Sequence, residues 1–554
     1  MKLPQWPKRP LTLAVLATWF AVHGVLGQCD PPKSVASRPS IRLTVVGSAA
    51  DDSSRLGVLT GSCWGNGSLI RSSLSLNSPA RRDDVVRFSL VDPTLASVRN
   101  SRIPVSLNDG AMWAGRGLNV AASAGLQATI GRVRLVLAPN LTWSQNLAFP
   151  ILPPPEDLRR LGPTPASYLS FFASPWHSGN VSADLPLRFG TQPYTRVDPG
   201  ETSVELSAFG GRVGATTASQ WWGPGIRNAL VMSNNSAGIP QVYFRTSHPV
   251  RTRFGEVEGH VMLGGLTESP FFDGSPYNNL RSLSAAVFTL RLKADSGLTI
   301  GVERAVYAAV SGIVRVPEHF ADILIDWHRP LPDGSASKRS DQITGVFARW
   351  VFPAAGFEAH AEWAKLQPPS SLRELLVDPQ RGQGYTVGLD WARPLTSVTI
   401  LRLQTEATML EQTPPVQGQE VPEFYASHSV RHGYTQQGQV VGAAIGPGSS
   451  SQFVGANLLH RNWQVGGSLG RIRWEEDAYY RAASGIVYRS HDVSLFSGMT
   501  GRYDSRHVQI EVGLTRTFRI NYLFQSANPY LYGSAFDVRN TTLSLRLSPH
   551  LQPH

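Results

Sequence analysis

The sequence predicts an all-β protein: a transmembrane antiparallel β-barrel with a small α/β subdomain at its N-terminus. Three observations predict this fold. The chain begins with an export signal, no later stretch is apolar for long enough to form a spanning helix, and apolar and polar residues alternate in many short runs. A spanning helix needs roughly 20 apolar residues in a row, whereas a barrel strand alternates between lipid and lumen.

Residues 1–27 have the three parts of a secretory signal peptide. Lys8 and Arg9 belong to a basic region, residues 11–26 are mostly apolar, and Gly27 suits the position before cleavage at Gln28. A retained membrane anchor is the alternative. The exported chain has a formal net charge of +11 before cleavage, with arginine as its dominant base. Such a chain suits anionic partners such as lipopolysaccharide or acidic polysaccharide, and we expect no nucleic acid.

Alternation with a period of two indicates strands along most of the chain. The clearest runs are 257–261, 357–363, 401–409, 472–474, 508–515 and 543–547. Their polar faces carry Glu, His, Arg and Gln, which suits a wet lumen better than a soluble sandwich. A large soluble β protein remains the alternative, because alternation alone does not separate the two. Trp143, Trp350, Trp363, Trp391 and Trp474 are candidates for the aromatic belts at the membrane interfaces.

The chain divides into three predicted parts: the signal peptide (1–27), a small periplasmic subdomain (28–104) and the barrel with extracellular loops (105–554). The barrel region has room for about 16 to 18 tilted strands of roughly 10 residues. In the subdomain we expect a strand at 41–46 and a short helix at 51–59. Cys29 and Cys63 are the only cysteines, and an oxidising periplasm favours a disulfide between them over free thiols.

Two loop-like segments, 220–228 and 433–439, combine aromatic rings with amide, hydroxyl and guanidinium groups. Rings stack on the apolar faces of sugars, and the polar groups supply hydrogen bonds. The candidate polysaccharide-binding residues are Trp221, Trp222, Arg227, Asn228, Tyr434 and Gln436. The alternatives are a Trp pair that anchors a loop at the membrane interface, and tight turns in the second segment.

A second group of polar residues is expected to face the lumen. Its members are Glu256, Glu258, His260, Arg349, Glu358, His360, Glu362, Arg402 and Glu406. Paired carboxylates are able to perform glycosidase chemistry, and with His they are able to bind a metal. We interpret the group instead as an electrostatic network that rigidifies or closes the barrel, and we expect no metal and no cofactor. The Gly-Gly-Ser-Leu-Gly motif at 466–470 lies in a strand-like run, not at a catalytic strand-to-helix turn.

Five motifs resemble the Wzi family of capsule assembly proteins. They are Asn-Asp-Gly-Ala-Met-Trp-Ala-Gly-Arg-Gly at 108–117, Gln-Trp-Trp-Gly-Pro-Gly at 220–225, Gly-Gly-Leu-Thr-Glu-Ser at 264–269, Phe-Ala-Arg-Trp at 347–350 and Gly-Tyr-Thr at 433–435. The resemblance implies an outer-membrane barrel of 18 strands with a small helical element on its periplasmic side. It also implies a lectin role without catalysis. The sequence departs from the family in two places. Its N-terminal region is less helical in pattern than the family's bundle, and its last residues, 551–554, do not form a strand that ends in an aromatic residue.

The sequence therefore predicts a non-enzymatic lectin in the outer membrane of a Gram-negative cell. It binds and organises capsular or extracellular polysaccharide, contacts outer-membrane lipids and lipopolysaccharide, and acts as a monomer. The alternative is an outer-membrane porin or exporter for solutes or polysaccharide. An outer-membrane hydrolase is the third hypothesis.

Overall fold

The computed structural model describes residues 40–41, 43–61, 68–76, 86–150, 181–272, 279–325, 340–366, 372–412, 422–481, 490–524 and 537–551. The predicted signal peptide, Cys29 and Cys63 lie outside these residues. Among the described residues, no helix has the length and apolar character needed to cross a membrane.

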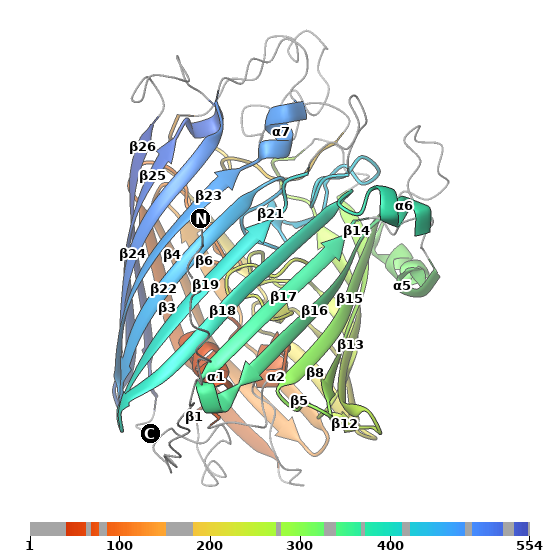
Figure 1. Cartoon of the computed structure of the whole chain (residues 1–554), viewed down its shortest axis with the longest axis vertical. Coiled ribbons are helices and arrows are strands. Elements are labelled where there is room, and N and C mark those ends of the chain that lie inside the picture. Colours follow the sequence, from red (N-terminus) through yellow and green to blue (C-terminus); the bar gives the residue numbers. More distant parts are fainter. Residues whose placement is uncertain are drawn as a thin grey trace, which may run out of the picture.

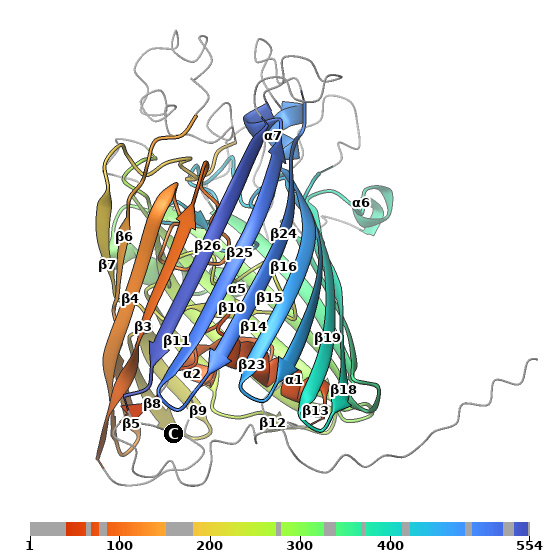
Figure 2. The same cartoon turned by 90° about the vertical axis from the view of Figure 1, so that its left-hand side faces the viewer.

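The strands form one closed antiparallel β-barrel with 18 strand positions, as predicted (Figures 1 and 2). Each strand pairs with its neighbours in sequence, and β26 pairs with β3 to close the wall. In chain order the wall consists of β3 (Arg87–Asn100), β4 (Gly117–Ile130), β5 (Val133–Leu137) continued by β6 (Asn140–Ser144), β7 (Tyr194–Asp198) continued by β8 (Ser203–Ala208), β9 (Gly211–Thr216), β11 (Gln241–Thr246) with the short β12 (Val250–Arg251), β13 (Gly255–Thr267), β14 (Leu280–Leu292), β15 (Leu298–Val310), β16 (Ser340–Phe352), β17 (Phe357–Lys365), β18 (Gln383–Thr396), β19 (Thr399–Met409), β22 (Ser450–His460), β23 (Trp463–Trp474), β24 (Asp492–Asp504), β25 (Val508–Ile520) and β26 (Val538–Pro549).

Short elements lie outside the wall order. They are β1 (Ser40–Ile41), α1 (Ala49–Leu59), β2 (Ile70–Ser72), α2 (Ser73–Leu76), β10 (Gln220–Trp222), η3 (Ile313–His319), α5 (Asp322–Ile325), η4 (Pro353–Ala355), α6 (Leu372–Val377), β20 (Thr435–Gln436), β21 (Gln439–Val440), α7 (Glu476–Arg481) and η5 (Tyr522–Phe524). All six alternating runs lie in strands. Successive side chains of a strand point to opposite faces, so an alternating sequence places apolar residues outward and polar residues inward.

The N-terminal region differs from its prediction in two ways. The helix expected at 51–59 is present as α1, whose N-cap Ser48 accepts a hydrogen bond from the Asp51 amide. The strand expected at 41–46 is reduced to β1, which pairs in parallel with β3. The boundary proposed at 104 does not coincide with the start of the barrel, since β3 is already a wall strand.

The two ends of the barrel are unlike. The connections from β4 to β5, β8 to β9, β14 to β15 and β18 to β19 are short turns, and the C-terminal end of the chain lies at that end (Figure 1). The connections at the other end are long, including 217–240 and 410–449. Outer-membrane barrels have short periplasmic turns and long extracellular loops, so the short-turn end is periplasmic.

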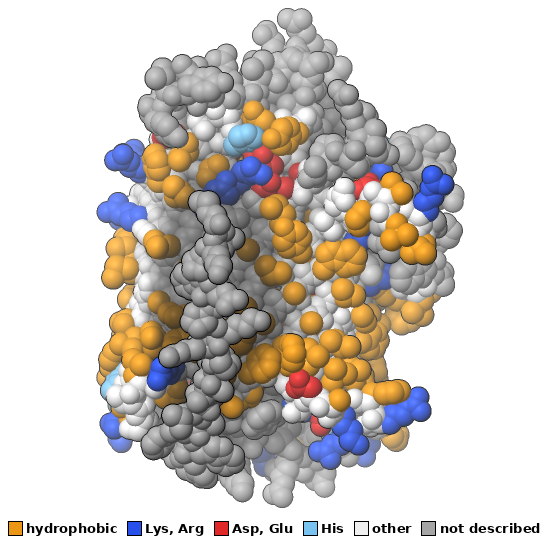
Figure 3. Space-filling model, viewed as in Figure 1, with side chains coloured by type: hydrophobic (Ala, Val, Ile, Leu, Met, Phe, Trp, Pro, Cys, Tyr) orange, Lys and Arg blue, Asp and Glu red, His pale blue; other side chains and the backbone are white. Residues whose placement is uncertain are grey.

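The outward face of the wall is apolar and has aromatic residues near both ends. Hydrophobic side chains spread over the outer strands, while most basic side chains lie toward the upper and lower ends of the barrel (Figure 3). Trp350 and Trp391 face outward near the short turns, and Trp143 and Trp363 near the long loops. Trp474 does not join these belts. It faces inward, and its ring packs against Arg519 at 4.8 Å.

Leu469 tests the assignment of the lipid-facing surface. It is 64% exposed in the middle of β23. An arginine near the bilayer midplane costs about 2–4 kcal/mol. We expect Leu469→Arg to lower the free energy of unfolding of the barrel in lipid vesicles by about 2–4 kcal/mol and to lower its urea midpoint accordingly. His507→Arg, in the exposed turn before β25, is the matched control and is expected to change it little. Equal effects of the two variants would contradict the membrane orientation.

Candidate functional site

Three segments enter the barrel and meet inside it. They are the N-terminal segment with α1, β2 and α2, the β9–β11 loop (217–240) and the β19–β22 loop (410–449). β2 pairs with β10 of the second segment, from Gln220 opposite Ser72 to Trp222 opposite Ile70. Figure 2 shows α1 and α2 behind the front strands, near the short-turn end. We call these three segments the plug.

The plug has an apolar core that it shares with the wall. Trp222, Tyr425 and Tyr434 are completely buried, and they belong to one cluster with inward side chains of β14, β15 and β16. The Tyr425 hydroxyl donates a hydrogen bond to the Leu230 carbonyl at 2.8 Å and accepts one from the Ala443 amide at 2.8 Å. This hydroxyl therefore joins the second segment to the third.

Two inward carboxylates of the wall hold the β9–β11 loop. Glu406 of β19 accepts hydrogen bonds from three consecutive amides, those of Ile226, Arg227 (3.1 Å) and Asn228 (3.0 Å). Successive amides that converge in this way form an anion-binding nest. Glu362 of β17 accepts a further hydrogen bond from the Leu230 amide. These amides of the loop backbone therefore find their hydrogen-bond acceptors in carboxylates of the wall.

Gly223 is required at the point where the loop passes Glu362. Its φ is +82°, in the left-handed region, and a Cβ atom there would lie 2.8 Å from a Glu362 carboxylate oxygen. Only glycine meets both demands without strain. This explains why a glycine follows the two tryptophans in the Trp-Trp-Gly-Pro-Gly motif.

Helix α1 is held in the lumen by a second set of charges. Arg402 bonds to Asp390 at 2.6 Å and to Asp52 of α1 at 2.7 Å. Arg55 of α1 pairs with Glu358, which also accepts a hydrogen bond from Arg349 at 2.8 Å. Each buried charge thus has opposite charges beside it, as burial demands.

The arginines also keep Asp52 ionised. The Asp52 side chain is 44% exposed, so its partial desolvation raises the pKa less than full burial would. The charges of Arg402 and Arg55 outweigh this effect and hold the pKa below its ordinary value. The attachment of α1 therefore keeps its full strength at neutral pH, and it weakens only as the pH falls below the ordinary range of an aspartate.

A third polar cluster lies on β8, β9 and β11. Glu205 pairs with Arg212 at 2.8 Å and with Arg245 at 2.7 Å, and it accepts a hydrogen bond from the Tyr243 hydroxyl at 2.9 Å. Arg245 also donates to the Leu74 carbonyl of α2 at 3.0 Å. Through Arg245, this cluster attaches α2 of the N-terminal segment to β11 of the wall.

The predicted lumen residues all lie on inward faces but fall into separate groups. Glu358, His360, Arg349, Arg402, Glu406 and Glu362 face the plug, as described above. Glu258 accepts a hydrogen bond from Ser68 at 2.7 Å, and His260 stacks on Tyr243 at 5.3 Å. Glu256 stands apart near the periplasmic end, where Arg291 pairs with it. Among the described residues, no cluster of His, Cys, Asp and Glu is arranged to hold a metal.

The six predicted polysaccharide-binding residues lie in the plug rather than on its surface. Trp221, Trp222, Asn228, Tyr434 and Gln436 are all at least nine-tenths buried. Arg227 is partly buried and lies over the Phe453 ring at 4.6 Å. Trp222 donates its ring N–H to Gln220 at 2.8 Å, and Gln436 accepts the Thr267 amide at 2.7 Å.

Sequence reasoning missed several residues that hold the plug. They are Asp52, Arg55, Glu205, Arg212, Arg245 and Asp390. Asp390 and Glu205 occupy polar positions of alternating strands, so the rule that found Glu358 also predicts their direction. Arg55 lies on a short helix whose docking partner the sequence does not show.

Exposed aromatic rings are present at the extracellular end, on and beside α7. Tyr480 is 66% exposed, its ring contacts Tyr479 edge-on at 5.2 Å, and His491 lies 4.5 Å from Tyr479. The Nδ1 atom of His491 lies 2.7 Å from a carboxylate oxygen of Glu476, within hydrogen-bond distance. This ring cluster lies among the long loops (Figure 1) and offers flat apolar surface next to polar groups.

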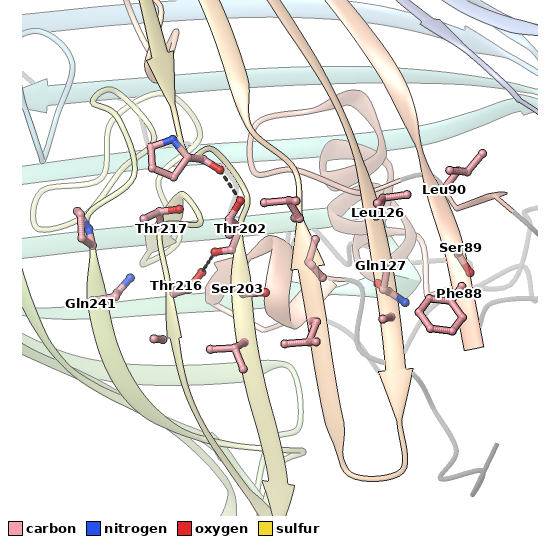
Figure 4. A pocket seen from close by; sticks show the side chains of 18 residues that line it. Phe88, Ser89, Leu90, Leu126, Gln127, Thr202, Ser203, Thr216, Thr217 and Gln241 are labelled. Carbon is pink, nitrogen blue, oxygen red and sulfur yellow. Dashed lines mark hydrogen bonds between the residues drawn. The ribbon is translucent and has the colours of Figure 1, made fainter. Parts of the chain in front are cut away.

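A groove of about 730 Å³ lies on the wall between β3 and β11 (Figure 4). It opens where the wall strand formed by β7 and β8 is interrupted at Pro199 and Thr202. Its lining includes exposed apolar side chains such as Phe88, Leu126 and Leu137. Such a lining suits the hydrocarbon of a membrane and offers few partners for sugar hydroxyls.

Comparison with known proteins decides the family. The model of the family described as capsule assembly protein Wzi matches residues 104–463, which is more than half of the chain. The chain belongs to the Wzi family of capsule assembly proteins. The protein is therefore an outer-membrane barrel, and the resemblance found in the sequence motifs is confirmed. No curated protein sequence matches the chain.

One solved structure supports the fold, and two porins give weaker matches. The structure of Escherichia coli Wzi, described as a carbohydrate-binding β-barrel involved in group 1 capsule assembly, matches with a TM-score of 0.51 at 10% identity and covers 82% of this chain and 84% of that one. Pseudomonas aeruginosa OccK2 (OpdF) matches with a TM-score of 0.38 at 9% identity, over 85% of this chain and 99% of that one. Pseudomonas aeruginosa OprD gives 0.37 at 10% identity, over 86% and 99%.

Glu406 is the residue whose removal should loosen the plug most directly. In Glu406→Ala, three loop amides lose their acceptor, and each unsatisfied buried group costs about 1–3 kcal/mol. We expect hydrogen exchange of the 226–228 amides to accelerate by about tenfold or more. Glu256→Ala is the control, since this inward carboxylate pairs with Arg291 and does not hold the loop. Unchanged exchange in Glu406→Ala would contradict the role of the nest.

Proposed function

We propose that the protein is a non-enzymatic outer-membrane lectin that binds and organises capsular or extracellular polysaccharide at the cell surface. Membership of a capsule assembly family supports this proposal, as does the fold shared with E. coli Wzi, which is described as carbohydrate-binding. The observation that carries it is the plug. A barrel whose interior is packed with protein acts through the surface of its loops.

The plug argues against the alternative of a porin or exporter. Arg402 and Arg245 of the wall hold the first segment, and carboxylates of β17 and β19 hold the second. Gln436 of the third segment accepts a hydrogen bond from the Thr267 amide of β13. Solute flow would have to break these bonds and expose a shared apolar core. The carboxylates of Glu358, Glu362 and Glu406 are each engaged by arginine or backbone amides, which leaves them little of the freedom that glycosidase chemistry needs.

The six residues predicted from the sequence then act beneath the binding surface. Trp221, Trp222 and Tyr434 fill the plug, and Arg227, Asn228 and Gln436 fix its loops. We propose that they position the extracellular loops for polysaccharide instead of stacking on sugars themselves. A direct contact would require these rings to leave the core, at a cost of about 3–5 kcal/mol for a large aromatic ring.

The contacts with polysaccharide are proposed to come from exposed groups of the long loops. Tyr480 and His491 provide ring faces, and sugars present apolar C–H faces that stack on such rings. Arg102 and Arg431 are exposed cations in long loops. Together they suit a polysaccharide that carries carboxylate groups, since guanidinium binds carboxylate through two parallel hydrogen bonds.

The binding test uses the purified barrel in detergent and the capsular polysaccharide of the source strain. The double variant Tyr480→Ala/His491→Ala should bind about tenfold more weakly, the equivalent of ~1.4 kcal/mol, because two ring faces are lost. Tyr503→Ala is the matched control, since Tyr503 is an exposed ring at the periplasmic end. A wild-type barrel that retains no polysaccharide would contradict the lectin proposal itself, whereas equal binding by the variants would exclude only the α7 rings.

A further inference from the structure

The outward face of β14, β15 and β16 carries polar side chains at a level where the wall should be apolar. On β15, Ile300 and Val302 face outward and are 41% and 52% exposed. Arg304 is two residues further on and therefore faces the same way. Gln342 of β16 lies beside it and accepts its hydrogen bond at 2.6 Å. An uncovered arginine there would face hydrocarbon.

The connection between β15 and β16 covers this patch from outside the barrel. Arg304 donates to the Ile323 carbonyl of α5, and the Ser284 hydroxyl of β14 donates to the Phe320 carbonyl at 3.0 Å. Ile323 packs on Ala286 and Val306, and Val316 of η3 packs on Leu263 and Val310. These wall residues lie on outward faces, so the η3–α5 segment (313–325) lies against the outer wall. Figure 1 shows α5 beside the barrel, below the level of α6.

The surface of this segment that points away from the wall carries four large apolar side chains beside one exposed ion pair, Arg315–Glu318. Val314 is 85% exposed, Leu324 73%, Ile313 68% and Phe320 55%. Four large apolar side chains on one short segment form a patch that water does not favour. The patch continues the apolar outer wall below it, where Phe288 and Val302 are exposed.

We infer that the η3–α5 segment is a membrane-resting brace that binds the acyl chains of outer-leaflet lipids. Backbone carbonyls on its inner side accept hydrogen bonds from Arg304 and Ser284. The apolar side chains on its outer side face the acyl chains of the lipids. The brace thus keeps lipid away from the polar side chains on the outer face of the wall. Continuity with the lipid-facing wall favours lipid over a second copy of the chain as the occupant. This inference is independent of polysaccharide binding.

Site-directed spin labelling locates the brace relative to the bilayer. Ile313→Cys, Val314→Cys and Leu324→Cys are made singly in a Cys29→Ser/Cys63→Ser background, labelled with a nitroxide and reconstituted into dioleoylphosphatidylcholine vesicles. Gln380→Cys, an exposed polar position of the β17–β18 loop, is the aqueous control. Oxygen concentrates in hydrocarbon, whereas a neutral nickel chelate stays in water. The ratio of the two relaxation effects therefore reports the environment of each label.

We expect oxygen to relax the labels at 313, 314 and 324 several-fold more effectively than the nickel chelate, and the reverse at 380. Two outcomes would overturn the inference. Nickel-accessible labels at 313, 314 and 324 would place the brace in water. Protection from both reagents, with spin–spin broadening that disappears on dilution with unlabelled protein, would identify a second copy as the occupant.

Discussion

The structure depends on the carboxylates that the wall directs into the barrel. A closed sheet of this size encloses more space than its own inward side chains fill, so the lumen is either wet or occupied by other parts of the chain. In this barrel the lumen is occupied by the chain: Glu406 accepts hydrogen bonds from three backbone amides of the β9–β11 loop, and Glu362 accepts one. β10 of that loop pairs with β2, and this pairing joins the N-terminal segment to the loop.

The charges and the apolar core of the plug depend on each other. A carboxylate buried without partners would destabilise the barrel, and the loop amides would be equally costly without an acceptor. Trp222 and Tyr425 exclude water from the space between them and the wall, which strengthens each buried hydrogen bond. The arginine pairs around α1 repeat this arrangement at the periplasmic end.

The fold was predictable from the sequence because alternation is a local property of each strand. The runs around Glu358 and Glu406 show both the strand and the direction of its polar side chains. The path of a loop is not local in this sense. Trp221 and Trp222 have the composition of an exposed sugar-binding loop, and they are buried by the pairing with β2 and by packing against residues far away in the sequence. Arg304 shows the converse: an arginine in a strand suggests the lumen, yet it faces outward because a later segment covers it.

Conductance across planar bilayers tests most directly whether the lumen is closed by these contacts. The wild-type barrel, inserted in known number, should show no sustained ion current at moderate voltage. The Glu362→Ala/Glu406→Ala variant should show frequent opening steps, because both carboxylate attachments of the β9–β11 loop are lost. A wild-type barrel that holds a steady open current would contradict the account, since no plug fastened as described could then occupy the lumen.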